Sequence, residues 1–391
     1  MMSSWITGVK QNNRTMQGLL RIGFLLIIWT FIVEGSVFAQ DYSAMISDED
    51  EQERLNKYER ELESYMKHFL IDDYDVRADS LWDRDYSSIA AFKRSIVPNI
   101  SRWRDIVIKP PTLRVTGEMK RTSYNLDGLQ GEWVQLPLEN NLSAQGILVI
   151  PKNAGKGRPV PLVITQHGIG SSPERPFTED GKSYHAYARK LVEAGFAVLS
   201  PLNLRSVQKR NNIERYTRLA NISLPGIEFS RTQNLLDVIL QDERIDAEKV
   251  GMWGVSLGGM ATAFWMPLEE RIKVGVISAW FNDRINKMIV QDSRWSSFVK
   301  NNEEYVFLTG WLQEFSERDL VSMICPRPLQ IQHGKKDGIA HWPYVVSEFE
   351  KSKDHYDKLE IGDRIELVLH EGRHEAKVEE GVKFLKKFLM D

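Results

Sequence analysis

Cysteine is almost absent from this chain: among 391 residues the only thiol is Cys325. A single thiol excludes a disulfide framework and a cage of thiolate ligands around a metal ion. An excess of one charge is also lacking, since 51 Lys and Arg residues stand beside 54 Asp and Glu residues and give a net charge of −3. Because no basic stripe is present, we expect no nucleic-acid partner.

The apolar run near the N-terminus is short. Lys10, Arg14 and Arg21 precede an uncharged run over 22–33, whose twelve residues are fewer than the roughly 20 that cross a bilayer core. Within Val37-Phe38-Ala39, Val37 and Ala39 then occupy the small-residue positions of a signal-peptidase site. We therefore predict a signal peptide over 1–39 and a secreted protein, periplasmic or extracellular, with no stable membrane association after cleavage. An uncleaved membrane anchor is the alternative.

Residues 40–111 have a helical pattern. Ser47 and the acidic residues after it suit the first turn of a helix, where the helix dipole favours negative charge. Apolar side chains then recur at helical spacing, at Leu55, Tyr58, Leu62, Tyr65, Met66 and Phe69. Further helix and loop follow as far as Pro110 and Pro111. We predict an N-terminal helical extension over 40–111.

From residue 112 onward, strand-like and helix-like segments alternate. Strands are expected at 132–138, 146–150, 161–165, 196–200, from 250, and at 274–278, 329–332 and 365–369. Helices are expected at 184–193, 229–241, 260–265, 344–355 and 376–389. The first two strands suit an antiparallel pair, and the later alternation predicts an α/β fold with a mainly parallel, doubly wound sheet and helices on both faces. One domain is expected over 112–391, with irregular lid insertions at 203–228 and 281–323.

The most informative motif is Gly-x-Ser-x-Gly at 254–258, between a strand-like and a helix-like run. This setting is the nucleophile elbow, in which glycines let the chain bend sharply at a serine held on a strained turn. The helix begins just behind the hydroxyl, so its free N–H groups face an oxyanion formed there. The motif predicts that Ser256 is a nucleophile and that the amide of Leu257 binds the oxyanion.

A serine hydroxyl needs a base to take its proton, and the base needs an acid to fix its tautomer. Asp337 follows the strand at 329–332, and His374 follows the strand at 365–369. Both positions are at carboxyl ends of strands, where ligands bind in open α/β sheets. We predict Asp337 as the acid and His374 as the base. A turn-forming role for Asp337 and a catalytic role for His370 in place of His374 are the alternatives.

A second oxyanion donor is expected from the loop after the strand at 161–165. The loop reads Gln-His-Gly-Ile-Gly over 166–170, and its glycines let backbone N–H groups turn toward the site. We predict the amides of Ile169 and Leu257 as the oxyanion hole, and a loop-bracing role for His167.

Together, the segments at 167–170, 254–259, 333–337 and 372–374 resemble those of the secreted dienelactone-hydrolase-like α/β-hydrolases. Acetyl xylan esterases and prolyl-oligopeptidase-type hydrolases share this outline. The resemblance covers roughly 130–391, and it implies the α/β-hydrolase fold and hydrolysis of esters. Ile169 stands where acetyl xylan esterases often have Tyr, and the segment at 203–206 departs from their Asp-x-Arg-Gly element.

A competing motif is His-Glu-x-x-His at 370–374, the pattern of zinc proteases. That chemistry needs a helix, so that two histidines one turn apart meet the metal. The segment before His370 alternates like a strand, and Gly372 disfavours a helix interior by about 1 kcal/mol. We therefore expect no metal site and no cofactor.

These residues predict a secreted serine hydrolase that cleaves carboxylic esters through an acyl-enzyme. Aromatic side chains are dense over 280–315, and most are expected in the core of a lid. Trp280 and Trp342 are candidates for stacking on a sugar ring. We predict a carbohydrate esterase that removes a short acyl group, acetyl, and whose substrate is a small-molecule or polysaccharide ester. A serine peptidase of the prolyl-oligopeptidase type and an inactive hydrolase-fold binding protein are the alternatives.

Overall fold

The computed structural model of the protein describes residues 47–179 and 183–390. The predicted signal peptide over 1–39 lies outside the described residues. The chain divides into two compact units, Met1–Lys67 and His68–Asp391. Of the first unit, the structure describes helix α2, Asp48–Lys67, whose first turn is acidic. No helix within the described ranges combines the length and apolar character that crossing a bilayer takes.

In the described part of the second unit, nine strands form one sheet in the order β1-β2-β3-β5-β4-β6-β7-β8-β9. Their bounds are β1 Lys120–Leu126, β2 Leu129–Pro137, β3 Ser143–Val149, β4 Val160–Gln166, β5 Ala197–Pro201, β6 Ile245–Val255, β7 Ile272–Ser278, β8 Leu329–Gly334 and β9 Ile365–His370. The strands β1, β2 and β3 pair antiparallel, as do β3 and β5. All later pairs are parallel. The predicted antiparallel pair and the mainly parallel sheet are therefore confirmed.

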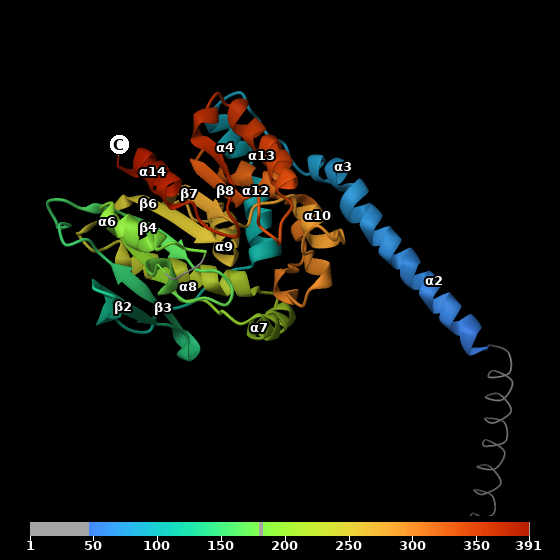
Figure 1. Ribbon diagram of the computed structural model, residues 1–391, viewed down its shortest axis with the longest axis horizontal. Helices are drawn as coiled ribbons and strands as arrows, with labels where there is room; N and C mark the ends of the chain where they lie inside the picture. Colours follow the sequence, from blue (N-terminus) through green and yellow to red (C-terminus); the bar gives the residue numbers. More distant parts are fainter. Residues whose placement is uncertain (1–46, 180–182, 391) are drawn as a thin grey trace, which may run out of the picture. The chain divides into compact units, whose positions relative to one another are not determined.

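Helices cover both faces of this sheet, as predicted (Figure 1). One hydrophobic core contains side chains of α8 Leu224–Ile239, α9 Leu257–Trp265, α12 Glu317–Ile324 and α13 Trp342–Asp357. The other core contains side chains of α6 Tyr187–Glu193 and α14 Val378–Leu389. At Gly381 of α14, a β-carbon would overlap the ring of Trp253 in β6, so glycine allows this helix to approach the sheet.

The helical segment before the sheet shares the first of these cores. It consists of η1 His68–Asp72, α3 Tyr74–Asp79, α4 Ile89–Ser95, α5 Val97–Arg102 and η2 Trp103–Ile108. Phe92 and Trp103 are fully buried with residues of α9, and the indole N–H of Trp103 donates to the carbonyl of Phe264 at 3.0 Å. Residues 74–108 and the sheet therefore pack around one core.

Both insertions contain more helix than the sequence pattern predicts. The stretch 203–228 holds α7, Val207–Leu219, and the start of α8. The stretch 281–323 holds α10 Arg284–Ile289, η5 Phe298–Lys300, η6 Glu304–Val306, α11 Trp311–Glu314 and most of α12. The prediction of an irregular stretch was wrong for α7 because its buried side chains are polar ones, Arg210, Asn211, Glu214 and Thr217. Its buried face therefore gives no hydrophobic periodicity.

Candidate active site

Ser256 lies alone between β6 and α9, with φ 59° and ψ −118°. A non-glycine residue in such a conformation stores backbone strain, which surrounding structure must hold in place. The Ser256 N–H donates to the carbonyl of Ser278 in β7 at 2.9 Å. At Gly254 a β-carbon would overlap the carbonyl of Gly258, so the bend requires glycine. The structure thus has the strand, sharp turn and helix expected around this serine.

Asp337 and His374 lie on the loops that follow neighbouring parallel strands, β8 and β9. The imidazole Nδ1 of His374 is 2.7 Å from Oδ2 of Asp337. The Asp337 side chain is 1% exposed and that of His374 is 27% exposed. The other oxygen of Asp337, Oδ1, accepts the N–H of Ile339 at 3.1 Å. The carboxylate of Asp337 is therefore buried and held by hydrogen bonds, whereas the imidazole of His374 is partly exposed to solvent.

The pKa of Asp337 reflects this environment. Burial raises the pKa, but the hydrogen bond and charge of His374, with the amide of Ile339, outweigh burial and hold it below its usual value. Asp337 is thus an ionised partner for the imidazole at neutral pH. A carboxylate in this position fixes the tautomer of a histidine and stabilises its protonated form.

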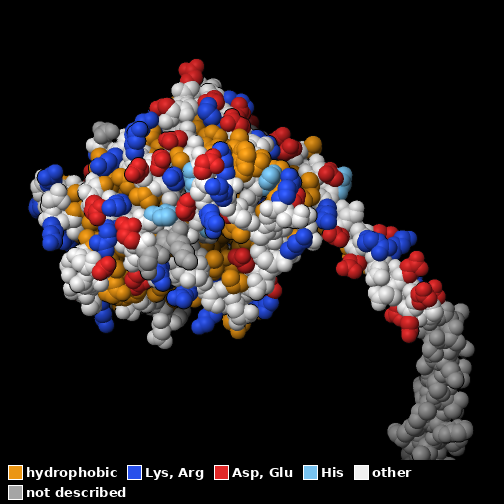
Figure 2. Space-filling view, in the orientation of Figure 1, with side chains coloured by type: hydrophobic (Ala, Val, Ile, Leu, Met, Phe, Trp, Pro, Cys, Tyr) orange, Lys and Arg blue, Asp and Glu red, His pale blue; other side chains and the backbone are white. Residues whose placement is uncertain are grey.

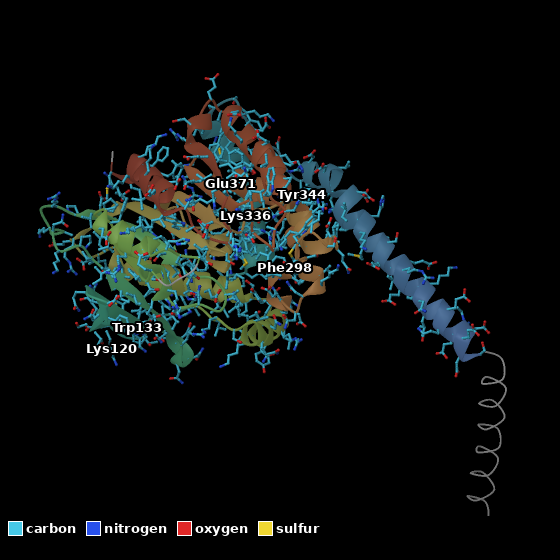
Figure 3. The ribbon with its side chains drawn as sticks, in the orientation of Figure 1. Lys120, Trp133, Phe298, Lys336, Tyr344 and Glu371 are labelled. Atoms are coloured by element: carbon cyan, nitrogen blue, oxygen red, sulfur yellow. The ribbon has the colours of Figure 1, made fainter. Side chains whose placement is uncertain are left out.

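Backbone contacts tie the two loops together. The N–H of Lys335 donates to the carbonyl of His370 at 2.8 Å, and the N–H of Lys336 donates to that of Gly372 at 2.9 Å. Glu371 pairs with the Nζ of Lys335 at 2.6 Å on the exposed side of these loops. Figure 3 labels Lys336 and Glu371 there, above Phe298 of the second insertion.

The loop after β4 passes beside the serine. At Gly168 a β-carbon would lie 3.3 Å from Cβ of Ser256. The N–H of Gly168 donates to the hydroxyl of Tyr184 at 2.8 Å, and that of Gly170 donates to the carbonyl of Arg205 at 2.8 Å. Between these anchored amides, the N–H of Ile169 has no acceptor among the described residues, nor has the N–H of Leu257 at the start of α9. Both predicted oxyanion donors are therefore unpaired in the described protein.

Two further histidines near the site, His167 and His370, bind backbone groups. His167 is buried; its Nδ1 is 3.0 Å from the carbonyl of Gly168, and its Nε2 accepts the N–H of Asn203 at 3.3 Å. This arrangement braces the loop, as predicted. His370 ends β9, and its Nδ1 accepts the N–H of Gly372 at 3.1 Å.

The segment 370–374 does not form the helix that a zinc protease needs. His370 is the last residue of β9, and the residues after it bend away without helical hydrogen bonds. The two histidines therefore do not lie one helical turn apart. Among the described residues, no group of three or more His, Cys, Asp and Glu side chains is arranged to hold a metal ion.

The two predicted tryptophans lie on different elements. Trp280 follows β7, and its Cβ is 2.8 Å from the position of a β-carbon on Gly259 in the first turn of α9. The guanidinium of Arg284 covers the Trp280 ring at 4.1 Å. Trp342 begins α13 and is 37% exposed. Trp280 is thus packed against α9, the helix that follows Ser256. Trp342 follows the loop of Asp337 in the sequence, at the start of α13.

A cavity of about 960 Å³, not expected from the sequence, lies beside the loop of Ile169. Residues 171–174 and 202–206, which follow β4 and β5, line one part of it. Trp133 of β2 lines another part, at the antiparallel side of the sheet (Figure 3). Over the face seen in Figure 2, positive and negative side chains are interspersed. The cavity lining comes from several loops and from α7 and α8, so no single sequence pattern could reveal it.

Comparisons with solved structures identify the architecture. A structure described as a putative acetyl xylan esterase from Bacteroides fragilis NCTC 9343 superposes with a TM-score of 0.58 at 16% identity, covering 73% of this chain and 78% of that one. A family 15 glucuronoyl esterase from Caldicellulosiruptor kristjansonii superposes with a TM-score of 0.55 at 17% identity, covering 78% and 87%. The fold is that of the α/β-hydrolases. No family model matches the chain.

The curated proteins that this chain resembles are distant in sequence. "Putative hydrolase YtaP" of Bacillus subtilis (strain 168) is 24% identical over 206 residues, which are 50% of this chain and 66% of that protein, just under two thirds. "Putative esterase YitV" of the same organism is 25% identical over 241 residues, which are 58% of this chain and 88% of that protein. The resemblance to esterase-type α/β-hydrolases that the motifs indicated is confirmed.

Proposed function

We propose that this α/β-hydrolase is a carboxylic ester hydrolase that works through an acyl-enzyme. The observation that carries the proposal is the 2.7 Å contact between His374 and Asp337, on loops at the same sheet edge as the strained Ser256. The names of the similar proteins, hydrolase and esterase, support the same reaction class.

In the proposed reaction, Ser256 Oγ attacks the ester carbonyl while Nε2 of His374 takes the hydroxyl proton. Nδ1 is bound to Asp337, so Nε2 is the nitrogen left for this transfer. The amides of Ile169 and Leu257 donate to the oxyanion, and their unpaired state in the described protein supports that role. His374 then gives its proton to the leaving alcohol, and water releases the acyl group by the same route.

The proposed substrate is a short-acyl ester, most of all an acetyl ester, of a saccharide, and the protein is proposed to be secreted. The cavity lined by residues 171–174 and 202–206 has room for a sugar residue. Trp280 and Trp342, which lie outside this lining, are proposed to stack on sugar rings. One similar structure is described as a "putative acetyl xylan esterase" and another as a glucuronoyl esterase. The uncharged run at 22–33 and the small residues Val37 and Ala39 motivate the proposed secretion.

A series of p-nitrophenyl esters tests the acyl preference. A pocket closed by bulky side chains excludes long acyl groups by overlap, whereas a lost methylene contact costs only about 1–3 kcal/mol. We therefore expect kcat/KM to fall sharply beyond butyrate and to change little between acetate and butyrate. A maximum at octanoate or longer would contradict the short-acyl proposal.

Natural substrates then separate the remaining candidates. Acetylated xylan, methyl-esterified uronates and proline peptides are to be assayed side by side. Release of acetate from xylan at the highest kcat/KM is the expected result. Faster cleavage of proline peptides would support the peptidase instead, and no turnover of any ester would support an inactive binding protein.

A further inference from the structure

Lys287 of α10, in the second insertion, is a buried cation that contacts the loop of Asp337. The residue is 6% exposed. Its Nζ donates to the carbonyl of Ile339 and to both the carbonyl and the Oγ of Ser296, the last at 3.0 Å. The ring centroid of Phe298 is 5.0 Å from the same nitrogen. All three protons of the ammonium group therefore have acceptors.

Ile339 connects this cation to the acid. Its carbonyl accepts from Lys287, and its N–H donates to Oδ1 of Asp337 at 3.1 Å. The other carboxylate oxygen binds Nδ1 of His374 at 2.7 Å. A continuous series of hydrogen bonds thus runs from Lys287 through the backbone of Ile339 to Asp337 and His374.

The two residues that follow Asp337 in its loop, Gly338 and Ile339, have little packing of their own. A β-carbon on Gly338 would meet no atom within 4 Å, and the Ile339 side chain is 45% exposed. Side-chain burial therefore does not fix the path of these residues. Hydrogen bonds from outside the loop must do so, and the bond from Lys287 comes from another element of the fold.

Lys287 keeps its charge at neutral pH despite burial. Burial and the neighbouring Arg284 lower its pKa to about 8, whereas Asp337 and Glu303 oppose that change. His333 of β8 is a further titratable group that faces Lys287. A buried cation costs more free energy than an apolar side chain of similar volume, so packing alone gives no reason for a lysine here.

We propose that Lys287 is a positioning residue for the hydrolytic reaction, which holds the loop of Asp337 so that the carboxylate orients His374. The proposal rests on the proposed function. Lys287 acts through Asp337 and not on the substrate. Its loss should therefore slow the chemical step and leave substrate binding almost unchanged.

Steady-state kinetics on p-nitrophenyl acetate test the positioning role of Lys287. Lys287→Met should lower kcat by on the order of 10²-fold, the cost of a displacement of about 1 Å in a catalytic group. The KM should stay within about twofold, because no binding contact is removed. Lys300→Met, at an exposed lysine of the same insertion, is the matched control and should leave both constants unchanged. Lys287→Gln retains one donor group and should give an intermediate kcat.

A double-mutant cycle distinguishes positioning from a general structural effect. In an Asp337→Asn background, Lys287→Met should lower kcat by less than about twofold, because residues that act through one partner are not additive. Equal losses in both backgrounds, or a rise in KM at constant kcat, would overturn the proposal. Ser256→Ala is assayed beside these variants: full activity there overturns the proposed function itself, whereas an inactive Ser256→Ala with additive Lys287 losses overturns only the role of Lys287.

Discussion

Gly258 faces the carbonyl of Gln166 so closely that a β-carbon on Gly258 would overlap that oxygen. Gly258 is in the first turn of α9, two residues after Ser256, and Gln166 ends β4, directly before the loop of Ile169. This contact sets the distance between the proposed nucleophile and one proposed oxyanion donor. Close approach, and not an unusual φ, is the reason for glycine at this position.

Replacing Gly258 should therefore impair both stability and activity. Gly258→Ala forces Gln166 and α9 apart, and overpacking of this kind costs about 1–3 kcal/mol of unfolding free energy. Because the displaced groups are the proposed catalytic ones, the loss in kcat, converted to a free energy, should exceed the loss in unfolding free energy. Thermal melting and p-nitrophenyl acetate kinetics measure the two effects. Gly157→Ala, where a β-carbon would meet nothing within 4 Å, is the control.

The buried ion pair of Arg210 and Glu228 should be essential to the first insertion. Nη1 of Arg210 lies 2.7 Å from Oε1 of Glu228, and the two side chains are 0% and 6% exposed. Arg210→Leu leaves the carboxylate buried without its partner, which costs about 3–5 kcal/mol. Urea unfolding at pH 7 checks this loss. Lys156→Leu, which removes the exposed pair with Glu243, should change stability by less than about 1 kcal/mol.

Glu348 of α13 should make stability fall with rising pH. Burial and nearby Asp283 raise its pKa to about 7, against the opposing effects of Lys351 and Arg318. In the folded state the carboxyl thus keeps its proton up to about pH 7, whereas in the unfolded chain it ionises near pH 4.5. The stability that the protonated Glu348 carboxyl contributes is fully present below its pKa in the unfolded chain. This contribution is lost as pH rises through its pKa in the folded protein, by at most about 1.4 kcal/mol per pH unit.

Glu348→Gln should remove this pH dependence, because the amide keeps an acceptor for the N–H of Arg318 but does not titrate. Unfolding free energies of the two proteins at pH 5, 6, 7 and 8 give the comparison. Parallel curves would show that Glu348 does not titrate in this range.

His374 and Glu371 should differ sharply in their effect on turnover. If His374 is the general base, its imidazole is the group that accepts the proton of the serine hydroxyl. His374→Ala should then abolish turnover, and Glu371→Gln should be mild, since Glu371 pairs with Lys335 at the surface. Chelators should have no effect. An enzyme that loses activity in chelator and regains it with zinc would contradict this account.

The three proposed catalytic residues could be predicted because each follows a strand at a turn with a local signature. The glycines around Ser256 mark the sharp bend, and Asp337 and His374 each come within a few residues of a predicted strand. Parallel strands bring their carboxyl ends to one edge of the sheet, so the three residues are expected at the same edge.

The parts that the sequence did not predict lack an apolar signal. Strand β1 is an edge strand whose first four residues, Lys120–Ser123, are exposed, so it shows no buried face. Helix α7 buries polar side chains, of which Arg210 depends on Glu228, 18 residues away. The contact of Lys287 with the backbone of Ile339 follows from tertiary structure alone, because nothing near either residue in the sequence marks it.

The most direct test of the proposed acyl-enzyme mechanism is covalent labelling of the intact protein. A fluorophosphonate probe should modify Ser256 alone, as identified by peptide mass spectrometry, and the Ser256→Ala variant should resist labelling. That variant should also lose ester turnover by many thousandfold while keeping the melting temperature of the parent protein. Labelling at another residue, or a variant that retains a tenth of the activity, would contradict the account.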